Sequence, residues 1–178
     1  MELIANQIPE EFRTVIPRGL RLVRRNNQEF LLVESIYCPR GHNLLVDSVH
    51  IHGEPSIKLE LVVGGGRGLA FIDAFWGSHA KLFSFLPEHG EGQMIEGFCP
   101  YCHASLLEEF HCHEEGCDSH TGLVLHLPGG SGKVYVCSRL GCPGHLLDIS
   151  SLPHELSESI SGINFFGAGT EDLFGGLE

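Results

Sequence analysis

The seven cysteines of this chain occur at spacings typical of metal ligands. Two cysteines three to five positions apart can bind one ion, because a tight turn directs both side chains to the same point. Cys112 and Cys117 form such a pair, and the pair recurs 25 positions later as Cys137 and Cys142. A tetrahedral zinc site needs four ligands, so these four thiols predict one complete site. The alternative is four free cysteines that bind nothing.

Three cysteines remain for a second site: Cys38, Cys99 and Cys102. This set lacks one ligand of a tetrahedral site. His42 is the predicted fourth donor, because it follows Cys38 by four positions and Gly41 permits the tight turn that brings the two side chains together. His103, or a histidine more distant in the sequence, is the alternative.

Other histidines near the cysteines leave the ligand sets open. His120 and His145 each follow the second cysteine of a repeated pair by three positions, so either one is an alternative to a cysteine ligand. We expect both to lie outside the ligand set, on the surface or hydrogen-bonded to a ligand. His111 and His113 flank Cys112 and are further alternatives.

The composition indicates the environment in which these sites form. Of the 178 residues, 42% are hydrophobic, which is enough to bury a core. The N-terminal residues lack the features of a signal peptide, and no apolar run approaches the roughly 20 residues that span a bilayer. We therefore expect a cytoplasmic protein without membrane contact, where clustered cysteines bind metal more often than they form disulfides.

The net charge of −12 argues against a nucleic-acid partner. There are 11 basic and 23 acidic side chains, whereas phosphate contacts need Lys and Arg. Six of the basic residues lie within residues 1–40, which keeps nucleic acid as an alternative. The partner that we expect is another protein or a second copy of this chain.

Short alternating segments between turns predict a mainly β fold with little helix. A turn at residues 25–28 predicts a hairpin between the first two strands. The predicted strands cover residues 20–22, 30–36, 57–63, 69–76, 82–86, 94–98, 123–127 and 134–137. Helical patterns occur at residues 104–110 and 152–160.

The paired cysteine turns, with β-hairpins between them, resemble those of zinc-ribbon proteins, and the chain is similar to a double zinc ribbon. The resemblance implies two zinc ions per chain, with the first ribbon interrupted by a small antiparallel β-domain at residues 43–97. The first predicted unit, residues 1–110, contains an N-terminal hairpin and this first ribbon. The second ribbon covers residues 111–150, and residues 151–178 form an acidic tail rich in Gly and Phe that is either loosely ordered or docks on a partner.

Three other motifs suggest different chemistry. Residues 99–102, CPYC, match the dithiol motif of glutaredoxins, but the βα elements that such a domain needs are not predicted after it. Residues 129–133, GGSGK, lack the flanking residues of a phosphate loop and predict a hairpin turn. His50 and His52 alternate on a predicted strand and would share one face, where a catalytic metal could bind. The interpretation that we favour is two solvent-facing histidines.

The function that these observations favour is a non-catalytic accessory subunit or adaptor, stabilised by zinc and acting through protein–protein contacts. One alternative is a small metalloenzyme that uses His50 and His52. Another is an iron–sulfur or redox protein, because a set of four cysteines binds iron as readily as zinc.

Overall fold

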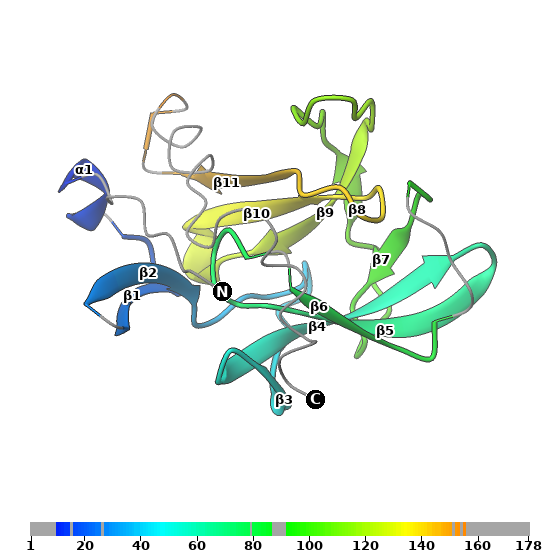
Figure 1. The fold of residues 1–178 in the computed structure, drawn as a ribbon, viewed down its shortest axis with the longest axis horizontal. Coiled ribbons are helices and arrows are strands. Elements are labelled where there is room, and N and C mark those ends of the chain that lie inside the picture. Colours follow the sequence, from blue (N-terminus) through cyan, green and yellow to red (C-terminus); the bar gives the residue numbers. More distant parts are fainter. Residues whose placement is uncertain are drawn as a thin grey trace.

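The computed structural model describes residues 10–155, except residues 15, 26, 79, 87–91, 151 and 154. These residues form a mainly β fold, as the sequence predicts, with three antiparallel sheets (Figure 1). The two short helical elements are α1 (Glu10–Arg13) and the 3-10 turn η1 (Pro128–Gly130). No helix in this part of the chain combines the length and the hydropathy needed to cross a bilayer.

The smallest sheet is the predicted N-terminal hairpin, which consists of β1 (Leu20–Arg25) and β2 (Gln28–Val33). All four residues from 30 to 33 are buried on β2. The outer side of β2 pairs with residues 74–76, because the Val33 N–H donates to the Ala74 carbonyl and the Trp76 N–H donates to the Leu31 carbonyl, both at 2.9 Å. The hairpin is thereby attached to the chain that follows strand β5 of the next sheet.

The second sheet has five strands and lies within the predicted β insertion and its border. Its main path runs in the order β3-β4-β5-β6, and β7 also pairs with β4. Along β4, alternate residues from Ile57 to Val63 are buried, as the period of a half-buried strand requires. The strands are β3 (Leu45–Ile51), β4 (Glu54–Val63), β5 (Gly66–Ile72), β6 (Lys81–Ser84) and β7 (Glu96–Phe98).

The third sheet has four strands in the order β11-β10-β9-β8 and lies above the five-stranded sheet in Figure 1. The turn between its central strands is η1, so GGSGK belongs to a hairpin turn as predicted. The strands are β8 (Leu107–Glu109), β9 (Thr121–His126), β10 (Gly132–Cys137) and β11 (His145–Ile149).

The predicted helix at residues 104–110 is wrong. Ser105 forms a bridge with Phe98, and Leu107–Glu109 is strand β8, which pairs with β9. This pairing buries Leu106 to 1% exposure within the core. Helix propensity favours a helix in this segment only weakly. The β8–β9 hydrogen bonds and the burial of Leu106 together favour the strand more strongly. The other predicted helix, residues 152–160, lies mostly outside the described residues, as does the Gly/Phe-rich tail.

One hydrophobic core joins the three sheets. Its members extend from Phe12 to Ile149 and include Leu31 of β2, Leu59 of β4 and Leu147 of β11, each with 0% exposure. The division into units at residue 110 stays a prediction. Strand β8, on the N-terminal side of this boundary, belongs to the same sheet as the strands that follow it.

Candidate metal centres

The structure gathers the eight predicted ligands into two groups that could each hold a metal ion. Within each group, one donor atom per residue lies within 4.8 Å of the others. The cysteine–histidine group contains Cys38, His42, Cys99 and Cys102. The four-cysteine group contains Cys112, Cys117, Cys137 and Cys142. Binding of a metal by these side chains stays a prediction.

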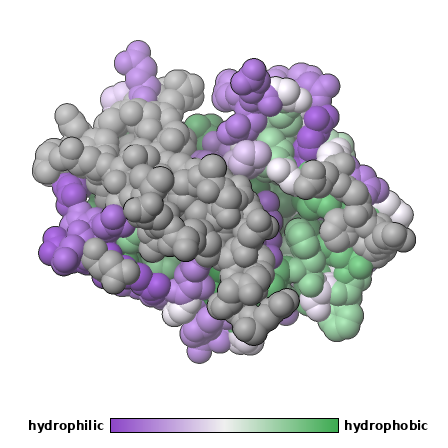
Figure 2. Space-filling view, viewed as in Figure 1, coloured by the Kyte–Doolittle hydropathy of each residue, from purple (hydrophilic) through white to green (hydrophobic). Residues whose placement is uncertain are grey.

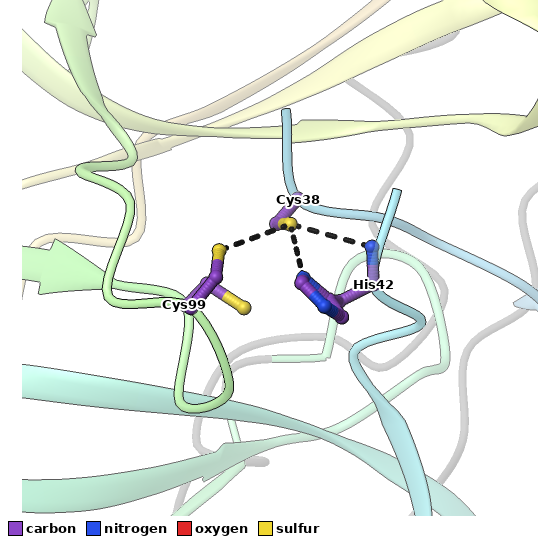
Figure 3. Close-up of side chains that lie close together, drawn as sticks. Cys38, His42 and Cys99 are labelled. Carbon is purple, nitrogen blue, oxygen red and sulfur yellow. Dashed lines mark hydrogen bonds between the residues drawn. The ribbon is translucent and has the colours of Figure 1, made fainter. Parts of the chain in front are cut away.

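The first half of the cysteine–histidine group is a tight loop between Cys38 and His42. The Cys38 N–H donates to the His42 carbonyl at 3.0 Å, and the Gly41 N–H donates to the Cys38 carbonyl at 3.0 Å. Gly41 has a φ of 89°, which glycine adopts without the strain that other residues meet there. The loop places His42 Nδ1 3.4 Å from Cys38 Sγ. The two side chains therefore face the same point, where Cys99 approaches from another loop (Figure 3).

The second half of this group follows β7 and directs His103 elsewhere. The Cys99 N–H donates to the Ala104 carbonyl at 3.0 Å and closes the loop that contains Cys102. This loop brings Cys102 Sγ to 3.8 Å from Cys38 Sγ. His103 has a φ of 60° and places its Nδ1 3.4 Å from a carboxylate oxygen of Glu60, on the neighbouring strand β4. The geometry therefore favours His42 as the fourth donor.

The four-cysteine group is built from two loops of the same design. The Cys112 N–H donates to the Ser119 carbonyl at 3.1 Å, and the Cys137 N–H donates to the Gly144 carbonyl at 2.9 Å. These bonds are 25 residues apart at both ends, so the sequence repeat is also a repeat of backbone structure. The first loop follows β8 and the second joins β10 to β11, and pairing of β8, β9 and β10 in one sheet sets the two loops side by side.

The sulfur–sulfur distances in the four-cysteine group match a single tetrahedral ion. A metal–sulfur distance of about 2.3 Å implies separations of about 3.8 Å between the ligands of a tetrahedron. The observed distances are 3.6 Å between Cys112 and Cys142 and 3.8 Å between Cys117 and Cys137. These two pairs thus have the separation that one ion requires without any rearrangement.

Backbone N–H groups point at the sulfur atoms of both groups. Cys38 Sγ accepts from Arg40 at 3.3 Å and from His42 at 3.4 Å. Further bonds of this kind run from Tyr101 to Cys99, from Arg139 to Cys137 and from Gly144 to Cys142, at 3.4 to 3.5 Å. Each N–H dipole stabilises negative charge on sulfur, which is the form that binds metal.

Burial and these hydrogen bonds shift the thiol pKa values in opposite directions. Burial opposes ionisation of Cys38, but the N–H groups of His42 and Arg40, together with the His42 ring and Cys99, lower its pKa to about 6. Burial raises the pKa of Cys112 to about 11 and also raises the pKa of Cys142. A metal that binds the four-cysteine group must therefore displace protons from these partly buried thiols.

Gly144 contributes to the four-cysteine group in a way that the sequence pattern did not predict. A Cβ atom at this position would lie less than 3.0 Å from Cys112 Sγ and 3.4 Å from Cys142 Sγ. The absence of a side chain therefore allows the two loops to approach each other. The repeat offered a signal, because Gly144 aligns with Ser119, but only the contact between the loops shows why one of them needs glycine.

The structure does not bring His50 and His52 together as a metal site. His50 Nε2 lies 2.8 Å from the exposed Asp47 carboxylate. His52 follows the end of β3 with a φ of 53°, so the alternation of the strand does not extend to it. Its Nδ1 contacts the buried carboxylate of Asp73. These contacts give the metalloenzyme alternative no support, and they show that His52 is half-buried rather than facing solvent as we favoured.

Two histidines near the four-cysteine group have other partners. His120 Nδ1 faces His111 Nδ1 at 3.1 Å, and His145 Nδ1 lies 2.9 Å from the Pro143 carbonyl. The side chains that converge in the four-cysteine group are Cys112, Cys117, Cys137 and Cys142, and the place of both histidines outside the ligand set stays a prediction.

The CPYC motif lies in the cysteine–histidine group and not in a glutaredoxin-like setting. Its two cysteines converge with Cys38 and His42. The element that follows the motif is strand β8, whereas a glutaredoxin motif begins a helix.

Comparison with protein-family models, with curated proteins and with solved structures finds no match to this chain.

Proposed function

We propose that the chain is an accessory subunit or adaptor that two zinc ions stabilise and that acts through protein–protein contacts. The observation that supports this proposal most is that each group offers four protein donors to one ion, which fills all four positions of a tetrahedral site. Structural zinc sites are closed in this way, whereas catalytic zinc keeps one position for water or substrate. Structural zinc contributes folding free energy on the order of 10 kcal/mol per site, which would stabilise a fold of short strands.

The spacing of the sulfur atoms favours one ion per group over an iron–sulfur cluster. A cluster places several iron atoms between its cysteines and would hold their sulfurs farther apart than a single ion does. The separations of 3.6 and 3.8 Å in the four-cysteine group suit a single ion. One imidazole among three thiolates is a common ligand set of structural zinc, and this favours zinc over iron at the cysteine–histidine group.

Exposed apolar side chains support the adaptor role. Phe85, Met94 and Tyr101 are 86%, 46% and 51% exposed. Figure 2 shows apolar side chains on the right of the molecule, over the region of β4, β5 and β7. Phe85 also has a φ of 63°, a conformation that costs on the order of 1–3 kcal/mol in a bulky residue and that is typical of functional surfaces. A partner protein would cover such side chains.

Metal analysis combined with chelation tests the structural role of zinc. We expect about two zinc ions per chain, one for each tetrahedral group. A strong chelator at constant pH should remove both ions and the near-UV circular dichroism of the packed core, and added zinc should restore them. A protein that keeps its fold after losing both ions, or that contains iron instead, would contradict this part of the proposal.

Cross-linking in a native extract tests the adaptor role. The zinc-loaded chain should capture a defined protein in stoichiometric amount, and the Phe85→Ser variant should capture less of it. Glu115→Gln is the matched control, because Glu115 is also exposed but polar. Equal capture by the unaltered chain and by both variants would show that Phe85 does not contact the partner. Capture of no protein would contradict the adaptor role.

A further inference from the structure

Two histidines outside the ligand groups direct ring nitrogens at each other. His111 Nδ1 and His120 Nδ1 lie 3.1 Å apart, and the ring planes meet at 75°. The residues face each other at the base of the first loop of the four-cysteine group, where the Phe110 N–H donates to the His120 carbonyl at 2.9 Å. Both side chains are exposed, so ions in solution can reach the two nitrogens.

A carboxylate lies beside the second ring nitrogen of His111. Glu109 Oε1 lies 3.1 Å from His111 Nε2. A carboxylate only accepts hydrogen bonds, so this contact favours the tautomer that carries its proton on Nε2 and leaves the Nδ1 lone pair available to a metal. Nδ1 is the atom that faces His120 Nδ1. The same arrangement, in which a carboxylate orients a histidine through its second nitrogen, accompanies histidine ligands in metal sites.

The distance between the two nitrogens suits one bound ion. A metal–nitrogen distance of about 2.0–2.1 Å to each ring, with the nitrogens 3.1 Å apart, gives an angle of about 100° at the ion. This value lies between the angles of octahedral and tetrahedral coordination. An ion could therefore bind both rings after a rotation of the two exposed side chains.

The internal repeat shows that closing the loop does not require two histidines. The positions of His111 and His120 correspond, 25 residues later, to Val136 and His145, which pair across β10 and β11. The second loop therefore forms with a valine at one position, and there the histidine turns its Nδ1 toward the Pro143 carbonyl. The facing nitrogens are an additional feature of the first loop.

We propose that His111 and His120 form a third metal site, which binds a divalent first-row ion such as Zn²⁺ through their Nδ1 atoms. Imidazole is a suitable ligand for this class of ion. Water fills the remaining positions, because both side chains are exposed to solvent. With two protein ligands in an exposed position, the ion exchanges far more readily than one held by four ligands.

Titration of the full chain with zinc, after both ligand groups are loaded, tests this site. Calorimetry should detect one additional ion per chain, and nuclear magnetic resonance of the ring nitrogens should show that Nδ1 of both histidines shifts. In the His111→Gln and His120→Gln variants the additional ion should be lost while two tightly held ions remain. His113→Gln is the matched control, because His113 is an exposed neighbour, and it should keep the third ion.

Four results would overturn the proposal. The first is the absence of a third ion at zinc concentrations that saturate exposed histidine pairs. The second is a third ion that persists in both His111→Gln and His120→Gln. The third is its loss in His113→Gln, which would show that the ligand set is different. A shift of Nδ1 at only one of the two histidines would also contradict it.

Discussion

Replacement of Gly144 by alanine should weaken the four-cysteine group through a single added methyl group. The new Cβ would lie less than 3.0 Å from Cys112 Sγ, and 3.3 Å from Cys137 Cβ. The backbone conformation of Gly144 does not lie in the left-handed region, so alanine can adopt it. The effect is therefore a steric one on the ligand sulfur.

The size of the effect follows from these contacts. Nonbonded heavy atoms pack at about 3.5–4.0 Å, so Cys112 Sγ must move by about 0.5 Å or more. Metal–ligand distances in a well-formed site vary by only about 0.2 Å. Overpacking of this kind typically costs about 1–3 kcal/mol. If this cost falls on metal binding, zinc affinity at the four-cysteine group drops by roughly 5-fold to 150-fold.

Competition with a chromophoric chelator measures this change, because the cysteine–histidine group of the same chain serves as the internal reference. Ser119→Ala is the matched control at the equivalent position of the repeat. It keeps a Cβ atom and removes the hydrogen bond from Ser119 to the Thr121 carbonyl, which should cost about 1 kcal/mol of stability without changing zinc affinity. Wild-type affinity in a folded Gly144→Ala protein would refute the reasoning.

The other predictions concern the cysteine–histidine group, the proton linkage of both groups and the buried Asp73. His42→Ala should reduce the zinc content from two ions to one by elemental analysis; an unchanged content would exclude His42 as a ligand. Zinc affinity should rise with pH more steeply at the four-cysteine group than at the cysteine–histidine group, because the pKa of Cys112 is raised to about 11 and that of Cys38 is lowered to about 6. Chelator competition across neutral pH, in variants with one group each, measures this, and a steeper rise at the cysteine–histidine group would contradict it. Asp73→Ala should lower the free energy of unfolding in urea by about 3 kcal/mol, because this carboxylate accepts bonds from a backbone N–H and two side chains; the exposed Asp47→Ala is the control, and equal losses would contradict the reasoning.

The sequence predicts most strands because their alternation is a local property. The half-buried β4 alternates in both sequence and structure. The segment 104–110 is different. Its residues suit a helix, and the strand that it pairs with, β9, comes later in the sequence, so the pairing cannot be read from the segment itself. Likewise, the alternation of His50 and His52 predicts one shared face, whereas the turn after β3 places His52 at a positive φ beside Asp73. The alternation of residue types does not predict at which residue a strand ends.

By itself, the sequence predicted the two groups of side chains that the structure brings together, because four-ligand coordination and close cysteine pairs are requirements of chemistry and of short turns. Counting ligands was enough to make His42 a candidate, and the choice over His103 needed the backbone at both loops. Only the tertiary structure decided which surfaces of the two loops touch. Glycine is needed at position 144 because the two loops touch there, and His111 faces His120 because they lie across one loop. A sequence pattern does not give distances between side chains that only folding brings together.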